Sequence, residues 1–454
     1  MSAAPAGSLR APPAGADERL ALAYRDRLFD TLGARPARRI DPPYGHPARA
    51  WARSGLMALT GTADGPPQMC PLPIAAAADG TLAALASLAP QADFSDLGGA
   101  RLLSERAALM SLRRAGAVSA GGACRLLQAA DGRLGLSLAR DDDWSLLPAW
   151  LEAEVADWDA VAACVRERGV DALVERGRQL GLAVAASRSE AGAPPWARVR
   201  VEGPRGDIAT RRMPLVVDLS SLWAGPLCSH LLQRCGAEVI KVESAARPDG
   251  ARRGAADFFD LLNAGKRSVT LDLQSSRGRA QLLALLRRAD IVIEASRPRA
   301  LRQMGIAAEA LLHDRANLSW ISIGGYGRDE PQAQWIAYGD DAGVAAGLSA
   351  VQQTVTGSSM FVGDAIGDPL TGLHAALAAW ASHRAGGSRL ISLALSDVVR
   401  HVAAFDRPAD DAALRARQAG WSRAIAASDI RPPQPRRSAS PARPLGADTS
   451  AVLS

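Results

Sequence analysis

Short apolar runs alternate with stretches of helical periodicity in the second half of the chain. The runs typical of buried strands lie at 214–219, 237–243, 289–296 and 318–327. Strands that alternate with helices in this way form a parallel sheet with right-handed crossovers. The pattern therefore predicts an α/β fold with an open, mostly parallel, Rossmann-like sheet. No G-x-G-x-x-G turn follows the first run, so a dinucleotide cofactor lacks its usual phosphate turn.

A different pattern precedes the sheet region. Apolar residues at helical spacing occupy 102–114, 143–154 and 157–180, and a short strand-like run lies at 134–139. We expect these residues to form a smaller α+β domain. Gly, Pro and charged residues at 187–212 mark a junction between it and the sheet region.

These patterns divide the chain into four segments. We expect a flexible leader at 1–16, a first unit at 17–205, a second unit with the parallel sheet at 206–400, and a C-terminal segment at 401–454. Within the last segment, residues 431–442 (RPPQPRRSASPA) have no apolar periodicity. Such a composition predicts a flexible tail.

Charge is spread along the chain. The 454 residues include 53 Lys and Arg and 47 Asp and Glu, and Lys241 and Lys266 are the only lysines. No dense basic run with interleaved aromatic residues appears, so neither nucleic acid nor a membrane is an expected partner. The longest apolar runs fall short of the ~18 residues of a membrane helix. Five cysteines without a C-x-x-C pair predict neither a metal site nor disulfides, and they fit a cytoplasmic protein.

One internal repeat links the two units. Residues 55–88 align without gaps on 347–380, an offset of 292. Three pairs of glycines coincide: Gly55 with Gly347, Gly65 with Gly357, and Gly80 with Gly372. Ala76, however, meets Asp368. The repeat therefore predicts an internal duplication in which one copy alone has a carboxylate at this position.

Asp368 has two possible roles. Gly367 precedes it and Pro369 follows it, which is typical of the first turn of a helix, where aspartate often caps the amides. A carboxylate at this place is also able to act as a nucleophile, because glycine leaves room for a substrate and helix amides stabilise negative charge. The residues alone leave both roles open.

Several segments, in this order, resemble one family. They are VVDLSSLWAGP, GAEVIKVE, NAGKRSVTLDL, ADIVIEASRPRALRQMGI, ISIGGYG and GDPLTGLHAALAAW, within residues 213–385. They resemble the class III CoA-transferases, the family of formyl-CoA and carnitine CoA-transferases. The resemblance implies that Asp368 is the catalytic nucleophile.

Other parts of the chain resemble further pieces of this family. Residues 54–68 resemble the stretch before the catalytic aspartate, 119–144 the small domain with its glycine loop, and 444–453 the C-terminus. The chain thus resembles a fused, partly degenerate double copy. Because family members are interlocked dimers, an intrachain pseudo-dimer is implied, with a further homodimer possible. Gly121 and Gly122 match the glycine loop, and an ordinary turn is the alternative.

The resemblance also implies the reaction. An acyl-CoA:carboxylate CoA-transferase of this family moves CoA from an acyl-CoA to a carboxylic acid acceptor. A mixed anhydride and an aspartyl-CoA thioester are the covalent intermediates. Coenzyme A takes part as a thioester substrate, and no permanently bound cofactor is implied. Water must be kept out, because both intermediates hydrolyse readily.

For CoA binding, the resemblance assigns one loop and one pocket residue. Trp223, Ala224, Gly225 and Pro226 match the loop that approaches CoA, and Leu271 matches a position in the adenine pocket.

The family's phosphate-binding residues are less well matched. Non-basic residues stand at several of these positions: Ser244, Gln274, Gln303 and Ile336. Arg302, with Arg297 and Arg299 nearby, is the candidate replacement, and solvated surface arginines are the alternative. Lys266 and Arg267 match a family segment, and their plain role is to tie a loop to the sheet.

Two other functions remain open. The related α-methylacyl-CoA racemases pair a histidine with an aspartate to move an α-proton, and His46 with Asp368 is the candidate pair. A non-catalytic CoA-binding partner is favoured by Ala76, which has no carboxylate to offer. The adjacent Asp340 and Asp341 are expected to begin a helix, with an acid–base dyad as the alternative. The remaining histidines are expected to be structural or exposed.

Overall fold

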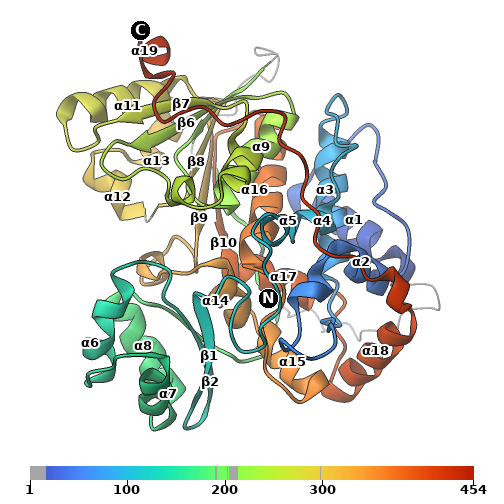
Figure 1. Cartoon of the computed structure of the whole chain (residues 1–454). Coiled ribbons are helices and arrows are strands. Elements are labelled where there is room, and N and C mark those ends of the chain that lie inside the picture. The colour runs from blue at the N-terminus through green and yellow to red at the C-terminus, as the bar shows by residue number, and fades with distance from the viewer. Residues whose placement is uncertain (1–16, 190–191, 202, 204–212, 297) are drawn as a thin grey trace, which may run out of the picture.

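The computed structural model describes residues 17–189, 192–201, 203, 213–296 and 298–454 (Figure 1). The expected leader at 1–16, part of the expected junction at 187–212, and Arg297 lie outside the described residues.

A seven-stranded sheet forms the centre of the second unit, and its edge strand β4 comes from the end of the first unit. Its strands are β4 Arg198–Val201, β5 Leu215–Asp218, β6 Glu238–Ser244, β7 Arg267–Leu271, β8 Ile291–Glu294, β9 Ser319–Gly324 and β10 Arg389–Ala394. They lie in the order β4-β10-β9-β8-β5-β6-β7, and every neighbouring pair is parallel except β4 with β10. The predicted mostly parallel sheet and its four expected strands are confirmed.

Side chains of the strands alternate between two helical layers. In β5, Val216 belongs to one apolar core, and Leu215 and Val217 belong to the other. The first core includes α9 Ala224–Arg234, α10 Ala256–Asn263, α16 Gly367–Arg384 and α17 Leu395–Ala404. The second includes α11 Ser276–Arg288, α12 Pro298–Gln303, α13 Ala308–Asp314 and α19 Thr449–Leu453. Burial on both faces explains why these strands read as continuous apolar runs.

A smaller antiparallel sheet belongs to the first unit, in green at the lower left of Figure 1. Its strands are β1 Cys124–Ala129, β2 Gly132–Ser137 and β3 Ala183–Ala186, and its helices are α6 Leu147–Leu151, α7 Trp158–Arg166 and α8 Val170–Leu180. These elements share a separate apolar core, as the predicted α+β domain requires.

The helices of the first unit are shorter than the sequence pattern predicts. Residues 102–114 contain the end of one helix and all of another, α4 Gly99–Leu102 and α5 Glu105–Leu109. Residues 157–180 divide into α7 and α8, because Gly169 is extended (φ −75°, ψ 144°) at the N-cap of α8. In 143–154, only α6 is α-helical, and it ends where Glu152 turns left-handed. Apolar spacing alone did not locate these local breaks.

The repeated segments have matching helices. The helices α1 Leu20–Leu32, α2 Pro47–Ser54 and α3 Ile74–Leu88 form the N-terminal part, and α14 Gly339–Ala345 and α15 Leu348–Thr356 precede α16. At the offset of 292, α2 corresponds to α14 and α3 to the first part of α16. Gly80 packs against α1, and its counterpart Gly372 packs against α9.

Helices α3 and α16 also contact each other. Nε1 of Trp380 donates to the carbonyl oxygen of Leu88 at 3.1 Å, and these residues are themselves 292 positions apart. Contacts between equivalent residues are typical of an approximate two-fold relation between the two segments.

The C-terminal segment lies against both units, beyond α18 Asp411–Arg423. Residues 431–442 were expected to form a flexible tail, and the structure instead holds them in place. Arg436 forms an ion pair with Glu105 at 2.6 Å, and the amide of Ala442 donates to Asp260 at 2.8 Å. Individual polar contacts fix this segment where an apolar face is missing, which the composition did not reveal.

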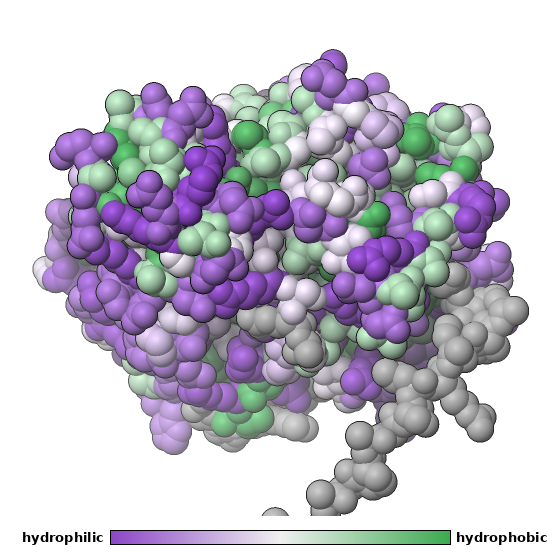
Figure 2. All heavy atoms as spheres, turned by 90° about the horizontal axis from the view of Figure 1, so that it is seen from below, coloured by the Kyte–Doolittle hydropathy of each residue, from purple (hydrophilic) through white to green (hydrophobic). Residues whose placement is uncertain are grey.

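The surface is polar and mixed in charge. On the face in Figure 2, hydrophilic residues predominate and hydrophobic residues form only small groups. Surface arginines pair with carboxylates: the exposed Arg200 pairs with Asp329 at 2.9 Å, and the partly exposed Arg234 pairs with Asp96 at 2.7 Å. Among the helices that the structure describes, none is long and apolar enough to span a membrane.

Candidate active site

Asp368 is the second residue of α16, and it keeps partial exposure while the helix behind it is buried. Ile366 occupies the N-cap position, so Asp368 is not the helix cap that its sequence context allowed. Its carboxylate accepts hydrogen bonds from the backbone N–H groups of Gly339 and Ala224. These donors begin α14 and α9, so three helix starts meet at this carboxylate.

Two glycines permit this close approach. A Cβ on Gly339 would stand 2.4 Å from Oδ2 of Asp368 and 2.2 Å from the carbonyl oxygen of Ala365, closer than atoms can pack. A Cβ on Gly367 would stand 3.1 Å from the carbonyl oxygen of Gly339. Gly367 therefore serves the packing of α14 on α16, besides leaving the carboxylate uncovered.

Carboxylates crowd the start of α16. Burial raises the pKa of Asp368 to about 7, while Arg106 lowers it and Asp340 raises it further. Burial also raises the pKa of Asp340 to about 6, and the Asp364 carboxylate adds to that rise. Near pH 7, Asp368 is therefore divided between its ionised and neutral forms.

The adjacent Asp340 and Asp341 begin α14, as predicted. Asp341 accepts from the amide of Tyr338 at 2.8 Å, which closes the first turn of the helix. Asp340 accepts from the amide of Ala365 at 2.8 Å and so fixes the turn that precedes Asp368. The two carboxylates have separate partners and are not a dyad. Within the described part of the chain, no group of three or more His, Cys, Asp or Glu side chains is placed to hold a metal ion.

Arg106 is a residue of this cluster that the sequence analysis missed. Its Nε donates to Oδ2 of Asp364 at 2.9 Å, and its Nη2 donates to Oδ1 at 2.5 Å. The Asp364 side chain is fully buried, whereas the arginine side chain is 23% exposed. The guanidinium carbon also lies 5.5 Å from the centroid of the Trp223 ring. Since Arg106 belongs to α5, the first unit supplies a positive charge to the second unit's carboxylate cluster.

The offset of 292, extended beyond the repeat at 55–88 and 347–380, contains a signal that could have found these residues. At the offset of 292, the charged residues of the cluster have apolar counterparts: Val398 for Arg106, Ala48 for Asp340 and Leu72 for Asp364. Changes from apolar to charged residues at positions 292 apart thus accompany the carboxylate cluster around Asp368.

The predicted glycine loop reaches the same cluster. A Cβ on Gly121 would stand 3.1 Å from Nη2 of Arg106, and the Ser119 side chain hydrogen-bonds to Asp340. Gly122 has a φ of +82°, which favours glycine, and its amide donates to the carbonyl oxygen of Ser119 at 2.8 Å. The structure therefore places Gly121 at the site and Gly122 in the turn that holds it there.

The loop at 223–226 leads into α9, and the amide of Ala224 reaches Asp368. Trp223 is buried and packs edge to face against Phe258, with ring centroids 5.3 Å apart. A Cβ on Gly225 would stand 2.2 Å from the Ser220 side chain, so the loop folds tightly on itself.

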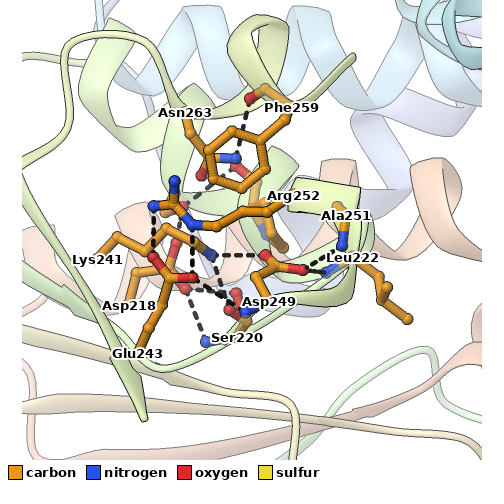
Figure 3. Close-up of polar contacts among 12 residues, drawn as sticks. Asp218, Ser220, Leu222, Lys241, Glu243, Asp249, Ala251, Arg252, Phe259 and Asn263 are labelled. Carbon is orange, nitrogen blue, oxygen red and sulfur yellow. Dashed lines mark hydrogen bonds and ion pairs between the residues drawn. The ribbon is translucent and has the colours of Figure 1, made fainter. Parts of the chain in front are cut away.

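Lys241 holds this loop from the sheet (Figure 3). Its Nζ donates to the carbonyl oxygen of Ser220 at 3.0 Å and pairs with Asp249 at 2.9 Å. Asp249 in turn accepts from the amide of Leu222 at 3.0 Å. This buried network fixes the residues that lead into the loop and ties them to Asp249.

Lys266, the other lysine, acts on the end of the loop. Its Nζ donates to the carbonyl oxygen of Pro226 at 2.9 Å and lies 3.3 Å from Oδ2 of Asp218. Burial lowers the pKa of Lys266 to about 8, although Asp218 opposes this. Burial would raise the pKa of Asp218, but Lys266 and Lys241 outweigh it and lower that pKa. Lys266 thus ties the loop to the sheet, whereas Arg267 pairs with Glu238.

Leu271 and Arg302 have other neighbours. Leu271 ends β7 and is buried in the apolar core on the α11 side of the sheet. Arg302 pairs with Glu309 at 3.1 Å, and its side chain is 55% exposed. Glu309 also pairs with Arg328, so Arg302 belongs to a surface ion-pair network. Arg299 is exposed.

His46 caps a helix of the first unit. Its Nδ1 accepts from the amide of Ala48 at 3.2 Å, and its ring lies edge-on to Trp421 with centroids 5.9 Å apart. At the offset of 292 its counterpart is Tyr338, the N-cap residue of α14. These contacts give His46 a structural role and do not join it to Asp368.

The segment that contains Asp368 is similar to a known protein family. Residues 214–426 match the model of CoA-transferase family III. Formyl-CoA:oxalate CoA-transferase of Rhodopseudomonas palustris (strain TIE-1) is 32% identical over 195 residues, which are 40% of this chain and 46% of that protein. Succinate–glutarate CoA-transferase of Agrobacterium fabrum is 31% identical over 213 residues, 42% of this chain and 53% of that protein.

The chain spans about half the length of the curated relatives it matches. Among solved structures, a CaiB/BaiF family protein from Brucella suis is 28% identical, with a TM-score of 0.38 over 43% of this chain and 55% of the other. Asp368 and the loop at 223–226 lie inside residues 214–426, which we call the CoA-transferase segment because they match the family model. Arg106 and Gly121 lie upstream of it. The site therefore combines the family segment with residues of the first unit.

Proposed function

We propose that the chain is an acyl-CoA:carboxylate CoA-transferase and that Asp368 is its covalent nucleophile. One observation carries the proposal: a partly exposed carboxylate at a helix start, inside the CoA-transferase segment, accepts backbone N–H groups from two further helix starts. Amides aimed at one carboxylate also stabilise the negative charge that develops when this group attacks a carbonyl carbon.

The reaction proceeds by exchanging bonds at two carbonyl carbons. An oxygen of Asp368 attacks the thioester carbon of an acyl-CoA; the C–O bond forms, the C–S bond breaks, and CoA leaves as its thiolate. The product of this step is a mixed anhydride of the acyl group with Asp368. The thiolate then attacks the Asp368 carbonyl carbon of the anhydride, which releases the donor carboxylate and leaves an aspartyl-CoA thioester. An acceptor carboxylate then takes the CoA by the same steps in reverse. Covalent catalysis divides one difficult exchange into easier ones.

The surroundings of Asp368 suit these steps. The ionised carboxylate is the nucleophile, and a pKa of about 7 gives a large ionised fraction at neutral pH together with good basicity. The glycine loop with Gly121 and Gly122 covers the cluster from the first unit and limits the access of water to the intermediates.

CoA approaches through the loop at 223–226 in this proposal. The amide of Ala224 already reaches Asp368, so this loop is next to the reacting carbon. Leu271, which is buried at the end of β7, is the proposed residue of the adenine pocket. The exposed guanidinium of Arg302 is the proposed contact for a CoA phosphate.

We further propose that the chain is an interlocked pseudo-dimer of two incomplete copies with one active site. Glu105 of the first unit and Asp397 of the second unit are 292 positions apart. Glu105 pairs with Arg436, which follows the second unit in the chain. Asp397 pairs with Arg198, which lies at the end of the first unit. The reciprocal exchange of segments supports interlocking. Ala76 stands where Asp368 stands in the other copy, so the second site has no nucleophile.

The proposal is tested by incubating the protein with a panel of acyl-CoA donors and short carboxylic acids in D₂O and following products by mass spectrometry. A new acyl-CoA made from the added acid, without deuterium at the α-carbon of the donor, is the expected result. Deuterium uptake without transfer would instead identify a racemase. CoA binding with neither product would identify a non-catalytic binder, and either outcome overturns the proposal.

A further inference from the structure

Arg106 has a binding capacity that its contacts leave unused. Its Nε and Nη2 each donate one hydrogen bond to the Asp364 carboxylate. Its Nη1 has no hydrogen-bond partner among the residues that the structure describes. The arginine side chain is 23% exposed, whereas the Asp364 side chain that it pairs with is fully buried. The guanidinium has donors in a fixed planar fork, so the pairing with Asp364 also fixes the direction of the free donors.

The place of Arg106 in the site narrows what these donors bind. A Cβ added to Gly121 of the glycine loop would lie 3.1 Å from Nη2 of Arg106. The ring of Trp223 lies beside the guanidinium, and the Asp368 carboxylate interacts with its charge. Arg106 therefore belongs to the same cluster as the Asp368 carboxylate. An anion drawn to the free edge of Arg106 is brought near that carboxylate.

The charge of the site changes during the reaction in a way that favours an anion there. In the aspartyl-CoA intermediate, Asp368 has become a neutral thioester, so Arg106 loses one of its anionic neighbours. The species that must enter next is a carboxylate, and it restores the missing negative charge. Arg106 and this incoming group are complementary in charge at that step.

We propose that Arg106 binds the attacking carboxylate of the acceptor acid, so that the first unit selects the second substrate for a reaction on the second unit. This inference rests on the proposed CoA-transferase function and deepens it. The acceptor's carboxylate oxygen attacks the Asp368 thioester carbon, the C–O bond forms, the C–S bond breaks, and CoA leaves as its thiolate. No proton or further reactant is needed for balance.

The repeat supplies a variant suited to this test. Arg106→Gln leaves Asp364 buried beside an uncharged partner, so it risks misfolding. The double variant Arg106→Val with Asp364→Leu removes both charges and uses the residues found at the equivalent positions, Val398 and Leu72. Replacing a buried ion pair by apolar residues is often neutral for stability. Arg113→Gln, an exposed change on the same unit, is the matched control.

Two half-reactions separate this inference from the proposed function. Adduct formation on Asp368 is measured with acyl-CoA alone, at the plateau of the pH profile of each variant, and transfer is measured against acceptor concentration. We expect both Arg106 variants to form the adduct, with the KM for the acceptor raised about ten- to a hundredfold, as for loss of a hydrogen bond to a charged group. Arg113→Gln is expected to match the wild type.

The outcomes have distinct meanings. An unchanged acceptor KM in variants that form the adduct overturns the role of Arg106 and leaves the proposed function intact. A wild-type protein that forms neither adduct nor product overturns the proposed function, and this inference with it.

Discussion

The ion pair between Arg436 and Glu105 leads to a prediction about stability, and a second ion pair of the chain provides its control. Arg436 donates from Nε to Oε1 at 2.6 Å and from Nη2 to Oε2 at 2.9 Å, and its Nη1 lies 2.7 Å from Nε2 of His230. Only 5% of the arginine side chain and 3% of the glutamate side chain are exposed. Arg436→Ala therefore leaves a buried carboxylate and a buried imidazole without this partner.

The expected cost follows from burial. Removing one member of a buried ion pair costs about 3–5 kcal/mol. Unfolding entropy of about 2.1 cal/mol/K per residue gives roughly 1 kcal/mol/K for a chain of this length, so the Tm falls by roughly 3–5 °C. The pair of Arg198 with Asp397, the carboxylate 292 positions after Glu105, has side chains 46% and 12% exposed, and it is the matched control. Arg198→Ala should cost about 0–1 kcal/mol and lower the Tm by at most about 1 °C.

Thermal unfolding of the wild type and both variants, followed by circular dichroism and by tryptophan fluorescence, measures this difference. Limited proteolysis adds a local readout, because loss of Arg436 should expose residues 431–442 to cleavage. Equal effects of Arg436→Ala and Arg198→Ala, or an unchanged Tm in both, would refute the reasoning that burial of the Arg436 pair fixes the C-terminal segment.

Other predictions concern the site. Since the pKa of Asp368 is raised from 3.8 to about 7, the folded state holds this proton more tightly than the unfolded state, and the free energy of unfolding should fall as pH rises through that window. Urea unfolding across pH should show a weaker dependence in Asp368→Asn, and an unchanged dependence would contradict the shift. Gly339→Ala puts a Cβ 2.4 Å from the Asp368 carboxylate, so it should abolish adduct formation in a mass assay. Gly420→Ala, where a Cβ meets open space, should have no effect, and an active Gly339→Ala variant would refute the close approach.

The sheet of the second unit could be predicted because its strands carry their own signal. Runs such as Val216 and Val217 in β5 are buried on both faces, so local sequence and tertiary position agree. The turn around Asp368 was also visible, since Gly367 and Pro369 mark a helix start. In each case a few neighbouring residues determine the structure.

The rest depends on contacts between distant parts of the chain. Arg106 reaches Asp364 across 258 positions, and nothing in the local sequence of α5 distinguishes this arginine from the many on the surface. Arg436 likewise sits in a Pro- and Ser-rich stretch whose composition predicts disorder, and its order depends on Glu105, 331 positions away. Asp368 itself illustrates the limit, because the donors to its carboxylate come from Gly339 and Ala224 and not from its own helix.

The central claim is that Asp368 forms a covalent bond with the acyl-CoA substrate. Intact-mass measurement after incubation with acyl-CoA, acid quenching and hydroxylamine trapping tests it directly in three proteins: wild type, Asp368→Asn and Asp411→Asn. Asp411 is an exposed carboxylate in the first turn of another helix, so it is the matched control. The account predicts an Asp368 hydroxamate in the wild type and in Asp411→Asn and none in Asp368→Asn. An adduct that persists in Asp368→Asn, or transfer without any adduct in the wild type, would contradict it.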